Sequence, residues 1–334
     1  MSSAAVEEYV LEDQPRKLTV VRDVPDRIFK AVATGGGVAV LLIMLLVGTF
    51  LTLRATKAIS SAGFSFLTTQ AWDTDNHNFG VAAVLVGTIL IATVAIVVAV
   101  PLSTATSLFL TEYASPRLRT LLIGVIDLMA AIPSVVYGLW GFFLLQGKVA
   151  PVAMWISRHF GWIPIFKVNG QDPSNPIPSS AAYTSSTLIA GLVVGMMITP
   201  VVTSIMREVF SQVPVGEREA ALGLGATRWG VIQSVVLPFG KGGMIGGTML
   251  GLGRALGETI AVYMIISPVF TIQPHILQTG SNSVSALIAL KFGEANDFGL
   301  SALMAAGLAL FLMTLVINFA ASSIVARSRS GASS

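Results

Sequence analysis

Six long apolar runs divide this chain, and they constrain its fold more than any other feature of the sequence. The hydrocarbon core of a bilayer is about 30 Å thick and takes about 20 helical residues to cross. Each run reaches that length, and together the runs cover residues 31–53, 81–110, 121–145, 185–206, 242–266 and 300–326. The sequence therefore predicts an all-α polytopic membrane protein with six transmembrane helices.

The composition also favours a membrane protein. Charged residues make up 11% of the chain, whereas soluble domains contain about 25%. Cysteine is absent, which excludes a disulfide framework and cysteine-based metal sites. The three histidines, His77, His159 and His275, are scattered outside the apolar runs, and this pattern favours surface positions over a metal site.

Lysine and arginine are unevenly distributed between the segments that join the apolar runs. Six crossings put both termini on one side. With the termini in the cytoplasm, twelve of the 20 Lys and Arg residues lie inside and six lie in the outside loops. The positive-inside rule thus predicts cytoplasmic termini, with an N-terminal arm 1–30, a transmembrane domain 31–326 and a tail 327–334. The net charge of +3 then reflects topology rather than nucleic-acid binding.

The fifth apolar run contains two charged residues, Arg254 and Glu258, one helical turn apart. Each costs roughly 2.5–3.5 kcal/mol near the bilayer centre, and such residues usually mark a pathway for substrates or ions. The planar guanidinium suits carboxylate or phosphate oxyanions. We predict a substrate pathway here; the alternative is a structural ion pair that locks helix packing. Asp127 in the third run is a further candidate, for which a cap or ion pair near the cytoplasmic interface is the alternative.

Glycines recur along the fifth run. On a continuous helix, Gly243, Gly247 and Gly251 fall within an arc of about 80°, and Arg254 and Glu258 fall inside the same arc. Small residues at this spacing let two helices approach closely in a membrane. We therefore expect this face to lie against another helix or a cavity and not against lipid.

The segment 211–238, between the fourth and fifth runs, is placed in the cytoplasm by the charge distribution. Pro214 favours a helix start, acidic residues follow in the first turn, and Gly223 and Gly225 predict a break before a second short helix. A small, mostly polar helix pair of this kind either docks on a partner or simply connects two spans.

The same segment resembles the EAA loop of bacterial ABC-importer permeases. That loop consists of Glu-Ala-Ala, three residues, Gly, nine residues and Ile-x-Leu-Pro; here the matching positions are Glu219, Ala220, Ala221, Gly225 and Val235–Pro238, with Val for Ile. The resemblance implies that this segment inserts into a groove of a cytoplasmic ATPase subunit and transmits its closure. It assigns ATPase coupling to Glu219, Ala220, Ala221, Gly225 and Pro238.

Two further stretches, "AAIPSVVYGLWG" (130–141) and "LGRALGETIAV" (252–262), resemble the phosphate-specific C-type permeases, PstC. The similarity covers most of the chain from about residue 80 onward and implies a type I importer (MetI-like) core in the bacterial cytoplasmic membrane. It also implies a heterodimer with a PstA-type permease, two PstB-type ATPase subunits, an extracytoplasmic PstS-type phosphate-binding protein, and phosphate as substrate.

The chain has no phosphate-binding loop of its own. The stretch "PFGKGGMIGG" (238–247) lacks the first glycine of that motif, and Lys241 is followed by Gly where Ser or Thr would hold Mg²⁺. We therefore expect a transport subunit that is not itself an enzyme and holds no cofactor, with ATP and Mg bound by the partner ATPase.

Two alternative functions remain beside phosphate import. A permease for another oxyanion, such as molybdate or sulfate, has the same charge requirement. An ion-driven carrier would use Arg254, Glu258 and Asp127 as relay groups but leaves the EAA spacing unexplained. For phosphate import, our hypothesis is that Glu258 holds Arg254 in a neutralised pair until phosphate competes for the guanidinium.

Overall fold

The computed structural model describes residues 24–170 and 179–330. Of the predicted arm 1–30, residues 1–23 lie outside the described residues, as do residues 331–334 of the predicted tail. Within the described ranges, six helical segments are long and apolar enough to cross a membrane. The chain is therefore an all-α polytopic membrane protein.

The chain divides into two compact units, Met1–Thr49 and Phe50–Ser334. The described part of the first unit is helical and belongs to α1 (Val24–Ala62). Helix α1 begins at Val24, inside the predicted arm 1–30. The end of the arm was predicted from where the apolar residues begin, and a helix can extend beyond its apolar part.

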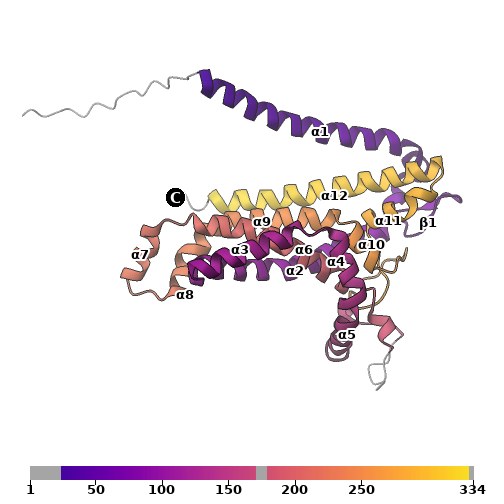
Figure 1. Cartoon of the computed structure of the whole chain (residues 1–334). Coiled ribbons are helices and arrows are strands. Elements are labelled where there is room, and N and C mark those ends of the chain that lie inside the picture. Colours follow the sequence, from indigo (N-terminus) through magenta and orange to yellow (C-terminus); the bar gives the residue numbers. More distant parts are fainter. Residues whose placement is uncertain (1–23, 171–178, 331–334) are drawn as a thin grey trace, which may run out of the picture. The chain divides into compact units, whose positions relative to one another are not determined.

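Three long helices form the centre of the second unit: α2 (Ala82–Leu108), α6 (Thr187–Ser211) and α9 (Leu237–Gly257). They run side by side with α12 (Asp297–Ser330), as Figure 1 shows. Glycines of α6 allow the closest approach: a Cβ added at Gly191 or Gly195 would lie 3.1 or 3.0 Å from a carbonyl oxygen of α2. Small residues therefore set the spacing of this pair.

The predicted run 121–145 contains a helix break. Helix α3 (Pro116–Ala131) ends before Pro133, and α4 (Ser134–Trp140) begins after it. Proline lacks an N–H and disfavours helical backbone at the residue before it, and Ile132 is accordingly extended, with ψ 128°. The run is therefore two helices in the structure.

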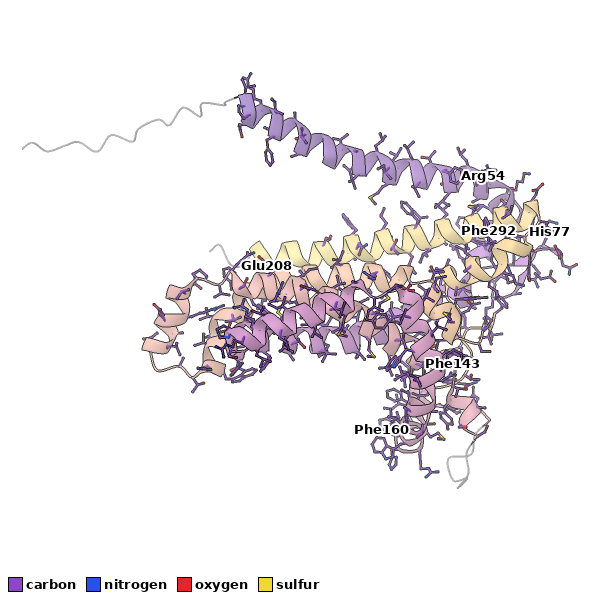
Figure 2. All side chains as sticks on the ribbon, in the orientation of Figure 1. Arg54, His77, Phe143, Phe160, Glu208 and Phe292 are labelled. Carbon is purple, nitrogen blue, oxygen red and sulfur yellow. The ribbon has the colours of Figure 1, made fainter. Side chains whose placement is uncertain are left out.

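After α4 the chain continues through a π-helical turn (Gly141–Leu145) into α5 (Gln146–Phe160). In Figure 1, α5 runs crosswise to the long helices, and Figure 2 labels Phe143 and Phe160 along this segment. Both rings are exposed. Helix α4, the π-helical turn and α5 together form one of the six segments that are long and apolar enough to cross a membrane, Ser134–Phe160.

The predicted run 242–266 is interrupted as well. Helix α9 ends at Gly257, Glu258 is extended with ψ 127°, and a short helix α10 (Ile260–Ile265) follows. The prediction that these residues share one face of a continuous helix therefore applies up to Gly257, and it is wrong for Glu258.

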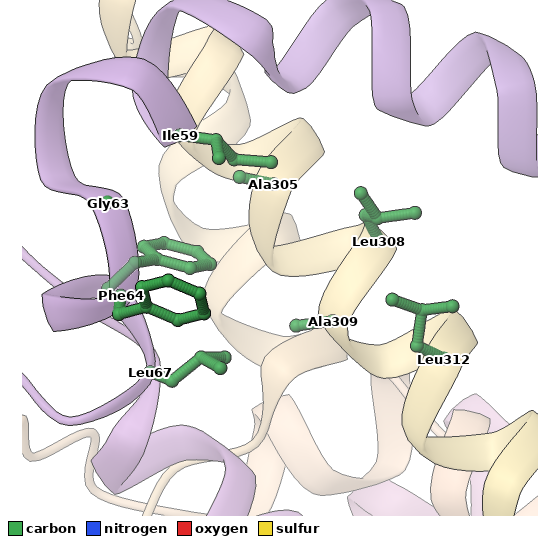
Figure 3. A pocket seen from close by; sticks show the side chains of 9 residues that line it. Ile59, Gly63, Phe64, Leu67, Ala305, Leu308, Ala309 and Leu312 are labelled. Carbon is green, nitrogen blue, oxygen red and sulfur yellow. The ribbon is translucent and has the colours of Figure 1, made fainter.

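Short elements cover the end of the bundle that the charge distribution places outside. They are η1 (Gly63–Leu67), a hairpin of β1 (Trp72–Asp73) and β2 (Asn78–Phe79), η4 (Pro164–Phe166), η5 (Ser180–Tyr183), α11 (Val284–Lys291) and η7 (Phe292–Glu294). Phe79 anchors the hairpin, with its ring edge-on to Phe66 and Phe298. Between η1 and α12 lies an apolar groove of about 270 Å³, lined by carbon-only side chains (Figure 3).

The opposite end carries a π-helical turn at the end of α2 (Phe109–Tyr113) and the segment that joins α6 to α9. This segment contains α7 (Val215–Gly223), α8 (Arg228–Val231) and a π-helical turn (Ile232–Val236) that leads into α9. Their inner side chains pack on Met206 and Phe210 of α6, both fully buried.

Candidate functional site

The two interrupted helices meet in the centre of the bundle. A Cβ added at Gly138 of α4 would lie 3.0 Å from Cα of Ala261 in α10, so the two short helices pack backbone against backbone. Non-helical backbone at membrane depth is tolerated only where protein buries it or where it lines a water-filled cavity. Broken helices that meet in this way are a feature of substrate sites in transporters.

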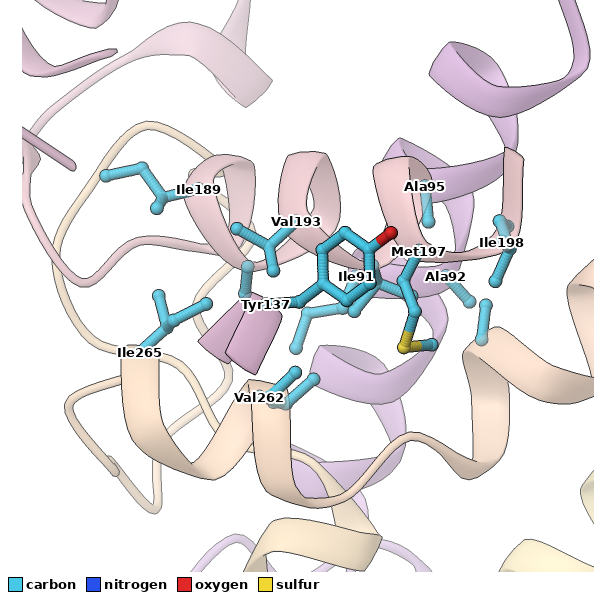
Figure 4. Close-up of a cluster of buried hydrophobic side chains, with 14 of the residues drawn as sticks. Ile91, Ala92, Ala95, Tyr137, Ile189, Val193, Met197, Ile198, Val262 and Ile265 are labelled. Carbon is cyan, nitrogen blue, oxygen red and sulfur yellow. The ribbon is translucent and has the colours of Figure 1, made fainter. Parts of the chain in front are cut away.

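Tyr137 lies at this meeting point. Its ring is buried among Ile91, Val193 and Met197 (Figure 4). Its hydroxyl donates a hydrogen bond of 3.0 Å to the carbonyl oxygen of Met129 in the last turn of α3, and thereby spans the break at Pro133. The sequence analysis did not select Tyr137; the available signal was Pro133, about one helical turn before a lone tyrosine in an apolar run.

Arg254 lies in the last turn of α9, three residues before the helix ends at Gly257. Its side chain is exposed on the described part of the chain and forms no ion pair there. Because an unpaired charge is costly in lipid, the exposed guanidinium requires water, an anion or a second protein subunit beside it.

The hypothesis that Glu258 holds Arg254 in an ion pair is wrong for this structure. In the described ranges the ion pairs are Arg218–Glu112 and Lys291–Glu294. Glu258 Oε1 instead accepts a hydrogen bond of 3.1 Å from the backbone N–H of Ala261 and caps α10. The physical reason is the end of α9 at Gly257, which takes residue 258 off the helical face that carries Arg254.

The three glycines singled out in the sequence face α6. A Cβ added at Gly243 would lie 2.6 Å from Val209 Cβ, and one at Gly251 would lie 2.7 Å from Val202 Cγ2. At Gly247 the nearest atom is Ile205 Cγ2, at 3.4 Å. Side chains at Gly243 and Gly251 would push α9 away from α6, so these two glycines set the distance between the helix that carries Arg254 and its neighbour.

Asp127 lies on α3, four residues before the helix ends, and is exposed. Neither ion pair in the described ranges includes it. The structure thus does not bring Asp127 into contact with Arg254 or Glu258 through a salt bridge. Its role in a pathway stays a prediction.

The residues of the EAA-like segment occupy different environments. Glu219 and Ala220 are exposed on α7, whereas Ala221 packs against the cluster that contains Phe210. Gly225 follows α7 with φ +87°, a backbone conformation that glycine adopts without the strain other residues incur. Pro238 is the second residue of α9. Because α9 continues the π-helical turn Ile232–Val236 within one helical segment, Arg228–Gly257, its missing N–H interrupts the helical hydrogen bonds at this point.

Sequence reasoning missed further residues of this segment. Leu222 is 50% and Leu224 is 90% exposed, so the end of α7 and the turn after it present apolar side chains. Arg218 forms the ion pair with Glu112, and a residue so distant in sequence gave no local signal. In residues 24–170 and 179–330 no group of three His, Asp or Glu side chains could hold a metal ion.

Together, the six apolar segments, the interrupted helices and the exposed segment at one end define a membrane permease rather than a soluble or intramembrane enzyme. Comparison with known families agrees: residues 99–330 match the binding-protein-dependent transport system inner membrane component. The chain belongs to this family, and within it to the PstC permeases. In such systems the ATPase is a separate subunit, and the chain is a transport component that is not itself an enzyme.

Several curated relatives support the assignment to the PstC permeases. A phosphate transport system permease protein PstC 2 from Mycobacterium tuberculosis is 38% identical over 303 residues, covering 90% of this chain and 91% of the relative. PstC from Pasteurella multocida is 40% identical over 282 residues, covering 83% and 84%. Among solved structures, an inward-facing MetNI methionine ABC transporter chain is 16% identical, with a TM-score of 0.48, covering 75% of this chain and 94% of that one.

Proposed function

We propose that this chain forms one half of the phosphate pathway of an ATP-driven importer, and that Arg254 is the residue that phosphate meets. The observation that carries the proposal is the exposed guanidinium of Arg254, which forms no ion pair in the described part of the chain and lies three residues before α9 ends at Gly257. Relatives named as phosphate transport permeases support the choice of anion.

The exposure of Arg254 supports a second permease subunit, and the similarity to PstC permeases supports the other partners. A membrane does not tolerate Arg254 against acyl chains, so a second permease subunit of the PstA type covers this side and completes the conduit. A PstS-type binding protein delivers phosphate from outside, and two PstB-type ATPase subunits bind below, with ATP and Mg held there. Both termini of the chain are cytoplasmic in this arrangement.

The proposed mechanism is alternating access. Closure of the ATP-bound ATPase dimer draws the coupling segments together and opens the conduit outward, and ATP hydrolysis reverses this change. The coupling residues are Glu219, Ala220, Ala221, Gly225 and Pro238. Phosphate interacts with Arg254 while passing, because a guanidinium without a carboxylate partner has its donors free for an oxyanion.

Reconstitution tests this function. The chain is co-expressed with its PstA-type and PstB-type partners, purified as a complex and inserted into liposomes together with the binding protein. We expect phosphate uptake that requires ATP, and ATP hydrolysis that phosphate stimulates. Uptake of sulfate or molybdate but not phosphate would assign the chain to another oxyanion, and uptake without ATP would assign it to the ion-driven carriers.

A further inference from the structure

The coupling helix α7 has little to hold it in place. It is nine residues long, has no fully buried residue, and exposes Val215, Leu222 and Glu219. An isolated helix this short is not stable in water. Its position must therefore come from contacts with the membrane domain, and those contacts decide which helices move when an ATPase moves α7.

One side chain of α7 reaches the ends of two core helices. Arg218 Nη2 donates a hydrogen bond of 2.7 Å to the carbonyl oxygen of Phe210, in the last turn of α6. The same nitrogen lies 3.2 Å from Glu112 Oε1, in the π-helical turn at the end of α2. A single guanidinium thus connects α7, α6 and α2.

This ion pair is shielded from water. The side chains of Arg218 and Glu112 are 23% and 13% exposed, whereas Lys291 and Glu294, the other pair in the described ranges, are 36% and 74% exposed. Exposed pairs contribute little, but removing one partner of a mostly shielded pair leaves a charge that water reaches only in part. The pair is therefore a firm connection between α7 and α2.

The ion pair does not use every donor of the guanidinium. Arg218 Nε is buried and makes no hydrogen bond in the described part of the chain. Glu112 Oε1 meets Arg218 Nη2 at 3.2 Å as an ion-pair contact without hydrogen-bond geometry. The guanidinium therefore holds Glu112 mainly through charge, while its hydrogen bond goes to the carbonyl oxygen of Phe210.

The two helices so connected lead to Arg254. Helix α6 packs on α2 through Gly191 and Gly195, and on α9 through Gly243 and Gly251. Closely packed helices move together because the interface has no free space. A displacement of α7 that is passed to α2 and α6 therefore reaches α9, while the covalent route to α9 runs through the turn at Gly225.

We propose that the Arg218–Glu112 ion pair is the joint that transmits motion of the coupling helix to α2 and α6. This inference rests on the proposed function, since it names the connection that the ATPase acts through. Without the joint, α7 can swing between Pro214 and Gly225 while the core stays still. ATP hydrolysis would then proceed without a matching movement of phosphate.

The test measures phosphate uptake and ATP hydrolysis in the same proteoliposomes containing the full importer. We expect Arg218→Gln and Glu112→Gln each to lower the phosphate transported per ATP by about 5-fold or more, the range of typical coupling between sites. ATP hydrolysis should persist. The control is Arg117→Gln, which removes an exposed arginine from the first turn of α3 and should leave the ratio unchanged.

Two further variants separate transmission from simple folding. Arg218→Lys, which keeps the charge but loses the fork, should reduce the ratio less than Arg218→Gln. The double variant Arg218→Glu with Glu112→Arg restores opposite charges and should recover part of the ratio. An unchanged ratio in both glutamine variants would overturn the joint. The proposal would also be overturned if the Arg218→Gln and Glu112→Gln complexes both lost their ATPase subunits and the double variant did not recover them. The ion pair would then only maintain the fold. A wild-type complex that takes up no phosphate would contradict the proposed function instead.

Discussion

The hydroxyl of Tyr137 donates a hydrogen bond of 3.0 Å to the carbonyl oxygen of Met129, and these two residues lie on opposite sides of the break between α3 and α4. The bond satisfies one of the carbonyl groups that a helix end leaves without a partner. It also fixes how α4 leaves α3, and α4 is the helix that packs on α10. The position of the broken helices near Arg254 therefore depends on a buried phenol.

Replacing Tyr137 with Phe should lower stability while keeping the shape of the buried ring. We expect a loss of about 0.5–1.5 kcal/mol, the usual contribution of one hydrogen bond, seen as a lower midpoint of thermal unfolding of the purified complex. The matched control is Tyr263→Phe on α10, because Tyr263 is exposed and no hydrogen bond from its hydroxyl is seen in the described ranges. Equal midpoints for the two variants would contradict the role of Tyr137.

The packing of α9 on α6 predicts different effects of the same substitution at two glycines. Gly243→Ala places a methyl group against Val209, and overpacking of this kind costs about 1–3 kcal/mol. A Cβ added at Gly246 has no other atom within 4 Å. Gly246→Ala should therefore be neutral or stabilising, because alanine is favoured over glycine in a helix. Thermal unfolding of both variants decides the point, and a stable Gly243→Ala variant would show that α9 and α6 are not in close contact.

Glu258 allows its charge to be separated from its capping role. Glu258→Gln keeps an oxygen that can accept from Ala261 N–H, whereas Glu258→Ala removes it and should cost about 1 kcal/mol, as for other side-chain caps. We therefore expect Gln to retain phosphate uptake better than Ala. If both substitutions reduced uptake equally, the negative charge itself would be required, as the ion-pair hypothesis held.

Gly225 provides a test of the coupling segment. Its φ of +87° makes Gly225→Ala strained by about 1–2 kcal/mol, and the turn between α7 and α8 should change shape. We expect weaker co-purification of the ATPase subunits with this variant. Gly223→Ala is the control, because Gly223 lies in helical backbone with open space around it; equal ATPase recovery from both variants would contradict the prediction.

The all-α membrane fold could be predicted from the sequence, because an apolar run of bilayer length has few stable structures other than a transmembrane helix. Pro133 is itself a local signal for the break between α3 and α4. The prediction of a single span over 121–145 did not use it, since proline within a span is often tolerated. The break at Glu258 has Gly257 as its one local signal. That signal is weak, because glycine occurs throughout α9 without breaking it. The missing Arg254–Glu258 pair follows from that break, as spacing along a chain predicts contact only while the helix continues.

The Arg218–Glu112 pair could not be predicted for a different reason. Its two residues come from segments separated in the chain by α3, α4, α5 and α6, so their contact depends on how the whole bundle packs. Family resemblance pointed to Glu219 and Gly225 in the same segment. The tertiary structure adds Arg218, the residue directly before Glu219, which connects the segment to the core.

The most direct measurement of the central claim is ATP-dependent phosphate uptake by an importer that carries Arg254→Ala. The complex should assemble and keep its ATPase subunits, because Arg254 is exposed and makes no ion pair in the described part of the chain. The account predicts that this complex no longer takes up phosphate, and that Arg254→Lys retains part of the activity. Uptake at the wild-type rate in the alanine variant would contradict it.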